Sequence, residues 1–333
     1  MIVLTKKGLS CEPGRFYIDP SGSVEHAVVT HAHSDHARRG SQRYYCAAPG
    51  VSLLKCRLGK NIIAQGIPYG EVFSLNGVEI SFHSAGHILG SAQVRMEYAG
   101  EVWVASGDYK RDPDPTCEPF EVVECDVFIT EATFGTPGYA WKKDADLGEQ
   151  IHRWWTANTD RGINSVLFAY SLGKAQRVLG VLHSKSEKPV YLHSAARELT
   201  ECYRAQGIKL IPTTCLSQAR GQLRGELILA PQAFLKSDQA RELLGPRYET
   251  AFASGWMAKG RFGFHGSYDR GFVMSDHADW NDLLRTIQET KAKRVYVQHR
   301  GNGALVRHLR GLGIQAFADS DLVPKAHPQM ALF

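Results

Sequence analysis

The 333-residue sequence lacks the features that mark a membrane protein, a secreted protein or a repeat array. No run approaches the ~18 consecutive apolar residues of a membrane-spanning helix, and the apolar run at the N-terminus is too short for a signal peptide. Internal repeats and low-complexity segments are also missing. We therefore expect a globular protein of the cytoplasm, with no membrane contact.

Cysteine is scarce and irregularly placed. The seven cysteines are odd in number, and no two of them form a C-x-x-C pair. This pattern argues against a disulfide framework and against a cysteine-based zinc site. Reduced thiols, most of them used for packing, fit a cytoplasmic protein.

The chain as a whole also lacks a strong excess of one charge, because its net charge is only +5. The distribution is uneven, however. Residues 133–270 hold 19 lysines and arginines against 12 aspartates and glutamates. This basic middle region favours a polyanionic partner.

Short apolar runs broken by glycine fill the first 130 residues and are typical of stacked antiparallel strands. Helices are expected there only after Asp35 and at residues 51–58. Beyond residue 142, helical periodicity alternates with short strands, which predicts an α/β lobe with a parallel sheet. Its helices are expected at 152–159, 173–183 and 196–207, and its strands at 165–170, 189–193 and 208–212. A glycine-rich stretch, 260–271, precedes a renewed strand and helix pattern, so we interpret the lobe as an insertion.

The densest group of potential metal ligands is THAHSDHA, which contains His31, His33, Asp35 and His36. Imidazole nitrogen suits zinc or manganese, and carboxylate oxygen suits harder divalent ions. We expect this segment to leave a strand and begin a helix, with its residues divided between two adjacent ions. The alternative is a solvated histidine-rich loop.

Two later residues also follow predicted strands. His87 lies in SAGHILGS, where Ala85 and Gly86 are small enough to let the backbone approach an ion closely. Asp108 lies in SGDYKRD, and its two oxygens can bridge both ions, as a neutral imidazole cannot. Considered alone, each would more often be a packed histidine or a turn aspartate.

In this order, the residues resemble the metallo-β-lactamase superfamily, with its HxHxDH motif, later histidine and later aspartate. The resemblance implies an α/β (α+β) fold in which two halves form an αββα sandwich with metals at the strand ends. It also implies that Asp19, in FYIDP, accepts a hydrogen bond from a ligand histidine and orients it.

Three further motifs resemble motifs A, B and C of the β-CASP nucleases within this superfamily. They contain Glu131 (VFITEATFG), His277 (VMSDHAD) and His299 (VYVQHRG). In that family a cap domain is inserted between motifs A and B. We therefore predict an α/β cap at residues 136–268, between metallo-β-lactamase parts at residues 1–135 and 269–333.

The predicted chemistry is phosphodiester hydrolysis by two divalent ions, zinc or manganese. One ion is expected on His31, His33, His87 and Asp108, and the other on Asp35, His36, Asp108 and His299. Two ions ~3.5 to 4 Å apart generate a bridging hydroxide and stabilise phosphoryl charge. Asp35 and Asp108 are thus expected to serve catalysis through the metals. His277, kept protonated by Glu131, is expected to act as the general acid.

The expected substrate is nucleic acid, attracted to the basic cap by counterion release. Lys174, ahead of a predicted helix, is a candidate phosphate contact. Four cap aromatics are candidates for base stacking, although a core position is the commoner use of paired tryptophans. They are Trp154, Trp155, Tyr170 and Trp256.

Within the β-CASP family, size and arrangement most resemble the bacterial ligase-associated DNA exonucleases, which are related to Artemis and the crosslink-repair nucleases. This implies DNA 5′-end exonuclease activity in DNA repair, in association with a DNA ligase and a helicase. His299 favours the alternative of an RNA-processing nuclease, because members of that kind carry histidine at motif C. A small-molecule metallo-hydrolase would not need the cap, and an inactive scaffold would be expected to have lost ligands.

Overall fold

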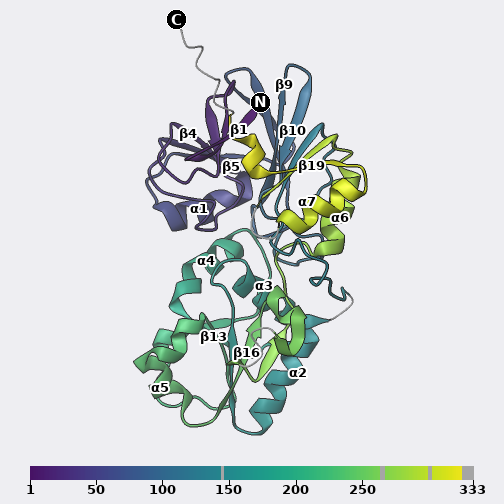
Figure 1. Cartoon of the computed structure of the whole chain (residues 1–333). Coiled ribbons are helices and arrows are strands. Elements are labelled where there is room, and N and C mark those ends of the chain that lie inside the picture. Colours follow the sequence, from purple (N-terminus) through teal and green to yellow (C-terminus); the bar gives the residue numbers. More distant parts are fainter. Residues whose placement is uncertain (144–145, 263–266, 299–301, 325–333) are drawn as a thin grey trace, which may run out of the picture.

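The computed structural model describes residues 1–143, 146–262, 267–298 and 302–324. The strands in these ranges form three sheets. Figure 1 shows two of the sheets face to face in one lobe and the third in a second lobe. The predicted α/β fold class is confirmed.

The first sheet has the strand order β1-β2-β3-β4-β5-β6. Its strands are β1 (Ile2–Thr5), β2 (Gly8–Cys11), β3 (Phe16–Ile18), β4 (His26–Val28), β5 (Arg43–Ala47) and β6 (Ala64–Ile67). From β3 to β6 the strands are parallel, so the expectation of antiparallel strands is wrong here. Parallel neighbours need long return connections, and the β4–β5 connection is the one that carries the THAHSDHA motif. The next connection contains α1 (Val51–Leu58), which confirms the helix predicted there.

The second sheet has the order β19-β18-β11-β10-β9-β8-β7. Its strands are β7 (Val72–Leu75), β8 (Val78–Ser84), β9 (Ala92–Tyr98), β10 (Glu101–Ala105), β11 (Val127–Thr130), β18 (Arg294–Val297) and β19 (Gln315–Ala318). Strands β7 to β10 are antiparallel, and β10, β11, β18 and β19 are parallel. Helices α6 (Trp280–Glu289) and α7 (Asn302–Gly311) lie on the outer side of this sheet, as α1 does on the first (Figure 1).

Alternating side chains explain how the two sheets pack. In β8, Val78, Ile80 and Phe82 point to one face and join the core between the sheets. Strand β11 is apolar on both faces, since Ile129 joins that core and Phe128 packs on the side of α6 and α7. The result is a layered helix, sheet, sheet, helix arrangement.

The third sheet is entirely parallel, as predicted, with the order β14-β13-β15-β12-β16-β17. Its strands are β12 (Asn164–Phe168), β13 (Val190–Leu192), β14 (Thr213–Cys215), β15 (Leu227–Ala230), β16 (Tyr248–Ala253) and β17 (Arg270–Phe272). The helices of this lobe are α2 (Leu147–Asp160), α3 (Lys174–Leu182), α4 (Ser194–Ala205) and α5 (Asp238–Leu244). The strand expected at 208–212 is wrong, because the chain pairs with β13 only from Thr213 onward.

The two lobes share buried apolar residues. One cluster joins Leu53 and Ile88 of the first lobe to Leu172 and Leu179 of the second. No helix in the described ranges is long and apolar enough to span a membrane.

Candidate metal centre and active site

The candidate residues gather where strands end. Five of them lie within three residues of a strand's C-terminal end: Asp19 after β3, His31 after β4, His87 after β8, Asp108 after β10 and Glu131 after β11. Because β3 and β4 are parallel, as are β10 and β11, these ends reach the same edge of their sheets. The sandwich therefore brings the side chains together.

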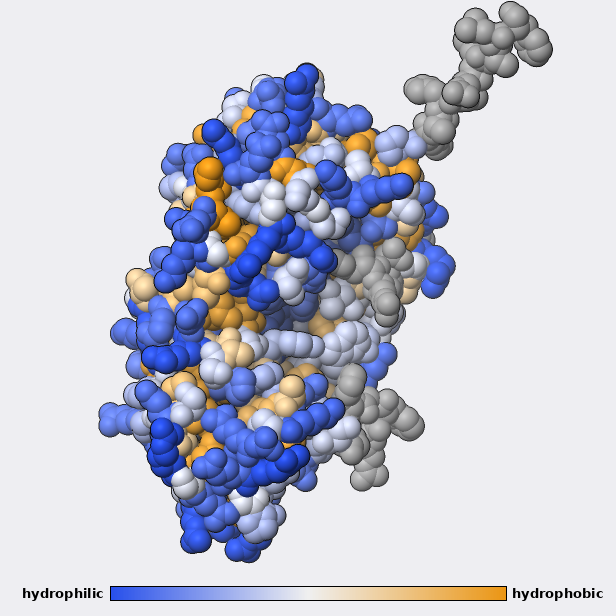
Figure 2. Space-filling model, turned by 90° about the vertical axis from the view of Figure 1, so that its left-hand side faces the viewer, coloured by the Kyte–Doolittle hydropathy of each residue, from blue (hydrophilic) through white to orange (hydrophobic). Residues whose placement is uncertain are grey.

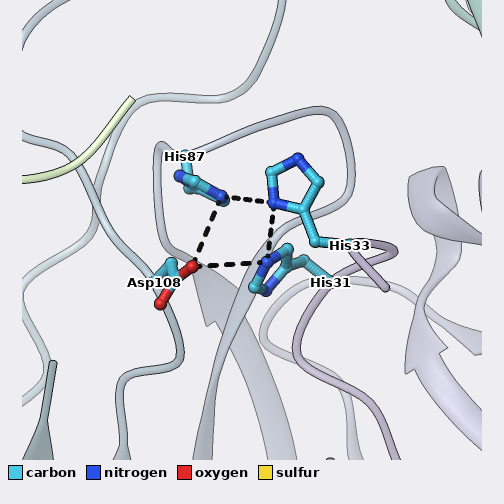
Figure 3. Close-up of side chains that lie close together, drawn as sticks. All are labelled: His31, His33, His87 and Asp108. Carbon is cyan, nitrogen blue, oxygen red and sulfur yellow. Dashed lines mark hydrogen bonds and ion pairs between the residues drawn. The ribbon is translucent and has the colours of Figure 1, made fainter. Parts of the chain in front are cut away.

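Four side chains converge most closely, as Figure 3 shows: His31, His33, His87 and Asp108. One ligand atom of each lies within 4.8 Å of all the others. The Nδ1 atom of His33 is 3.0 Å from Nε2 of His31 and 3.0 Å from Nε2 of His87. Three imidazole nitrogens and one carboxylate oxygen in this space fit a zinc- or manganese-type divalent ion.

The protonation of these histidines suits metal binding. Burial lowers the pKa of His31, His33 and His87 below the ordinary value. For His31 and His87, the positive charge of neighbouring histidines lowers it further. The three rings are therefore neutral near pH 7, the form that can ligate a metal.

Asp108 occupies a central position. Its Oδ2 atom lies near ring nitrogens of four histidines: 3.6 Å from His31, 3.5 Å from His36, 3.8 Å from His87 and 3.9 Å from His277. This single carboxylate thus lies beside four histidines of the candidate centre. The position suits a ligand shared between two ions.

Of the residues expected around a second ion besides Asp108, the structure describes Asp35 and His36. Nε2 of His36 is 3.5 Å from Oδ2 of Asp108 and 3.8 Å from Oδ2 of Asp35. The helix expected after Asp35 is wrong, because residues 34–36 form a turn closed by the His33 carbonyl. Asp35 is exposed in this turn and faces the pocket. His299 lies outside the described residues.

Asp19 holds His36 in place. Its carboxylate accepts hydrogen bonds from the Thr30 amide at 2.8 Å and the Thr30 hydroxyl at 2.6 Å, and it lies 2.7 Å from Nδ1 of His36. Nδ1 is thereby occupied, which leaves Nε2 facing Asp108. Burial lowers the pKa of His36, but the carboxylates of Asp108 and Asp19 outweigh burial and raise it well above the ordinary value.

His277 pairs with Glu131 next to this cluster. Nδ1 of His277 is 2.9 Å from Oε2 and 3.1 Å from Oε1 of Glu131, which is almost fully buried and also accepts from the Tyr109 amide. Burial lowers the pKa of His277, but Glu131 and Asp108 outweigh it and raise the pKa to about 9. His277 is therefore protonated at neutral pH, with Nε2 left for a partner in the pocket. Asp108, Glu131 and His277 also form a second group whose ligand atoms lie within 4.8 Å.

The side chain of Lys174 is not placed as the sequence predicts. We expected an ammonium facing a phosphate, but its side chain is buried, and Nζ lies 2.8 Å from Asp276 and donates to the Met274 carbonyl at 2.9 Å. Arg177, one turn further along α3, also pairs with Asp276 and with Asp114. Lys174 therefore joins α3 to the segment that carries His277.

Gly86 has a structural role that the sequence did not predict. Its φ is +67°, and a Cβ there would lie 2.5 Å from the Lys110 carbonyl oxygen and 3.0 Å from the Phe120 amide nitrogen. Glycine is therefore needed so that the backbone can pass these segments before His87. The close approach is to protein backbone.

A pocket of about 680 Å³ opens over the metal-centre residues, between the lobes. Residues of both lobes line it, including His33, Asp108 and His277 on one side and Tyr170, Lys174 and Trp256 on the other. Figure 2 shows one mainly hydrophilic face of the molecule, with smaller apolar patches around the waist between the lobes. The pocket also contains Arg57, which no sequence pattern distinguishes from any other helical arginine.

Several known proteins are similar to this chain in sequence. A protein from Opitutus terrae named as a probable DNA ligase is 31% identical over 307 residues, which are 91% of this chain and 29% of that protein. An RNase J-like protein from Methanocaldococcus jannaschii is 25% identical over 60% of this chain and 55% of its own length. Endoribonuclease YSH1 from Saccharomyces cerevisiae is 31% identical over 35% of this chain and 15% of its own length.

The chain thus spans little more than half of one of these relatives and much less of the others. No family model matches it. Among solved structures, a protein of unknown function from Enterococcus faecalis aligns with a TM-score of 0.55 at 14% identity, over 91% of this chain and 80% of that one. That likeness concerns the fold alone.

Proposed function

The chain belongs to the β-CASP branch of the metallo-β-lactamase superfamily, and on this premise we propose that it is a metal-dependent DNA 5′-end exonuclease of DNA repair. The observation that carries the nuclease proposal is the convergence of His31, His33, His87 and Asp108 beside the His277–Glu131 pair. The preference for DNA is supported by the probable DNA ligase that matches 91% of this chain. Association with a DNA ligase and a helicase is part of the same proposal.

We propose that the chain holds two divalent ions, zinc or manganese. His31, His33, His87 and Asp108 would hold the first, and Asp35, His36, Asp108 and the predicted ligand His299 the second. When bound, such a pair supplies an activated water and positive charge that stabilises the phosphoryl oxygens. The cap is proposed to be residues 136–268, inserted between the two parts of the metallo-β-lactamase domain.

The remaining chemistry belongs to the side chains around this centre. Asp19 fixes the ring of His36 through Nδ1. Glu131 does the same for His277 and keeps it protonated. The Nε2 proton of His277 can then pass to the oxygen of the departing nucleotide, as general-acid catalysis requires.

An RNA-processing nuclease is the second candidate. It is favoured by the relatives named RNase J-like protein and endoribonuclease YSH1. Both candidates use the same site and differ in the sugar of the substrate.

The deciding experiment compares single-stranded DNA and RNA of the same base sequence, each labelled at the 5′ or the 3′ end. We expect zinc or manganese to support stepwise loss of nucleotides from the 5′ end of DNA. The Asp108→Ala variant serves as the control without a complete centre. Faster degradation of RNA would establish the second candidate, and cleavage of neither polymer would refute both.

A further inference from the structure

We propose that Arg57, Tyr170 and Trp256 form a subsite for an unpaired stretch of nucleic acid, in which the arginine binds a backbone phosphate and the two rings stack on bases. This inference rests on the proposed nuclease function and specifies its substrate as single-stranded. It concerns the pocket wall outside the candidate metal ligands.

The structure separates the four cap aromatics into two kinds. Trp154 and Trp155 are only 4% and 2% exposed, and their ring N–H groups donate to Glu249 and to the Gly225 carbonyl. They belong to the core of the lobe. Tyr170 and Trp256 are 59% and 37% exposed, and both line the pocket. Large exposed rings in a pocket signal a binding role more strongly than scattered surface residues do.

The fold brings these two rings to the same edge of the cap sheet. Strands β12 and β16 are parallel neighbours with Phe168 opposite Phe252. Tyr170 comes just after β12, and Trp256 lies in the 3₁₀-helix (Gly255–Phe262) that follows β16. The carboxyl ends of parallel strands are the usual ligand-binding edge of an α/β sheet, and here that edge faces the metal-centre residues.

The Tyr170 and Trp256 rings lie near different residues of the candidate metal centre. The Tyr170 loop continues to Leu172, whose carbonyl lies 3.2 Å from Nε2 of His33. The Trp256 ring packs on Phe134, with centroids 4.9 Å apart, and Phe134 in turn lies 6.1 Å from the His277 ring.

The position of Trp256 is rigidly set. A Cβ at Gly255 would lie 2.6 Å from the Phe134 ring and 2.9 Å from Ser275. The Tyr139 ring meets the Trp256 ring edge-on at 5.3 Å and 90°. A ring held in this way loses little freedom when a base stacks on it.

Arg57 supplies the charge. It lies in the last turn of α1 and lines the pocket. Its Nε atom is buried without a hydrogen-bond partner, and within the described ranges no carboxylate forms an ion pair with it. Lys174, another cation of the pocket wall, already pairs with Asp276. A guanidinium with unused donors beside a phosphodiester site is suited to bind a phosphate.

The chemistry of the subsite selects unpaired strands. Bases in a duplex already stack on one another, so their faces reach a side chain only when the strand is single or locally opened. The pocket volume of about 680 Å³ also falls in the ~300–1,000 Å³ range of small-ligand sites. We therefore expect a single-stranded end to enter, with its bases against Tyr170 and Trp256.

The test measures binding of fluorescein-labelled single-stranded oligonucleotides, with and without abasic positions near the 5′ end, to the metal-free 333-residue chain. Tyr170→Ala and Trp256→Ala are each expected to weaken binding of the intact strand about 5- to 150-fold. They should change binding of the abasic strand much less. Tyr170→Phe and Trp256→Phe should retain most of the affinity, because they keep a ring.

Arg57→Gln is expected to weaken binding of the intact and the abasic strand equally. It should also reduce the slope of log affinity against log salt concentration by about 0.7. Arg57→Lys should keep the slope. Matched controls are Tyr98→Ala, an exposed ring outside the pocket, and Arg153→Gln, an exposed cap arginine. Both controls should bind like the wild type.

Equal losses for intact and abasic strands in the ring variants would overturn the stacking assignment, and an unchanged salt slope in Arg57→Gln would overturn the phosphate assignment. Neither result would affect the nuclease proposal if the wild type still degrades DNA or RNA. Failure of the wild type to cleave either polymer would instead refute the nuclease proposal, whatever the binding data show.

Discussion

At the scale of single residues, neighbouring histidines in one pocket differ in charge because of their carboxylate partners. Burial keeps His31, His33 and His87 neutral. His277 lies 2.9 Å from Oε2 of Glu131, and this carboxylate outweighs burial and raises the pKa of His277. Environments that separate pKa values in this way assign different chemical roles to the same residue type.

The general-acid assignment predicts the behaviour of His277→Ala. Turnover of single-stranded substrate should fall by about 10²- to 10⁴-fold, because proton transfer to the leaving oxygen is lost. Metal content, measured by atomic emission, should stay near the wild-type value. His83→Ala is the matched control, since His83 pairs with Glu121 at 2.8 Å outside the pocket. Loss of metal together with activity would show that His277 is a ligand.

At the scale of elements, buried ion pairs join α3 to the segment that carries His277. Its Lys174 and Arg177 meet Asp276, next to His277, and Arg177 also meets Asp114, which pairs with Lys110. All of these side chains are nearly inaccessible to solvent. Such a network is costly to break, because each removal leaves an uncompensated charge in the interior.

Asp114→Asn tests this network through its pH dependence. At pH 7 the free energy of unfolding should fall by about 3–5 kcal/mol, because Lys110 and Arg177 lose a partner. Burial raises the pKa of Asp114, but Lys110 and Arg177 outweigh burial and lower it below the ordinary value. The carboxylate's contribution is therefore complete above its unfolded pKa of about 4 and is lost as the pH falls through the lower folded value.

Urea unfolding at pH 7 and pH 3 measures the free energy of unfolding and its dependence on pH. The stability gap between the wild type and Asp114→Asn should be smaller at pH 3. Asp238→Asn, in an exposed pair with Arg241, should change stability little at either pH. A gap that is constant with pH would contradict the assigned role of the Asp114 charge.

At the scale of the whole molecule, the two lobes share one buried cluster. Leu53, Ile88 and Leu89 of the sandwich pack with residues of α2, α3 and the strands of the second lobe. The pocket over the candidate metal centre lies along the same junction. The relative position of the lobes is thus maintained by apolar packing as well as by charge.

We expect the two lobes to unfold in a single cooperative transition. Far-ultraviolet circular dichroism and tryptophan fluorescence should give coincident urea curves. Ile88→Ala should shift both curves together and lower the free energy of unfolding by about 2–5 kcal/mol. Two separate transitions in the wild type would show that the lobes are independent.

The sequence by itself predicted the α/β class and the parallel sheet of the second lobe, because strand periodicity depends on local patterns. It also singled out the histidines and the aspartate that converge at the candidate metal centre, because ligand chemistry is a property of each side chain. It failed for the turn after Asp35 and for the direction of strands β3 to β6, which depend on how distant segments pair. Only the tertiary structure decided that Lys174 is buried against Asp276 while Arg57 faces the pocket without an ionic partner among the described residues. It also decided that Tyr170 and Trp256 are exposed while Trp154 and Trp155 are core. The physical reason is that burial and charge pairing are set by residues far away in the sequence, which no local pattern contains.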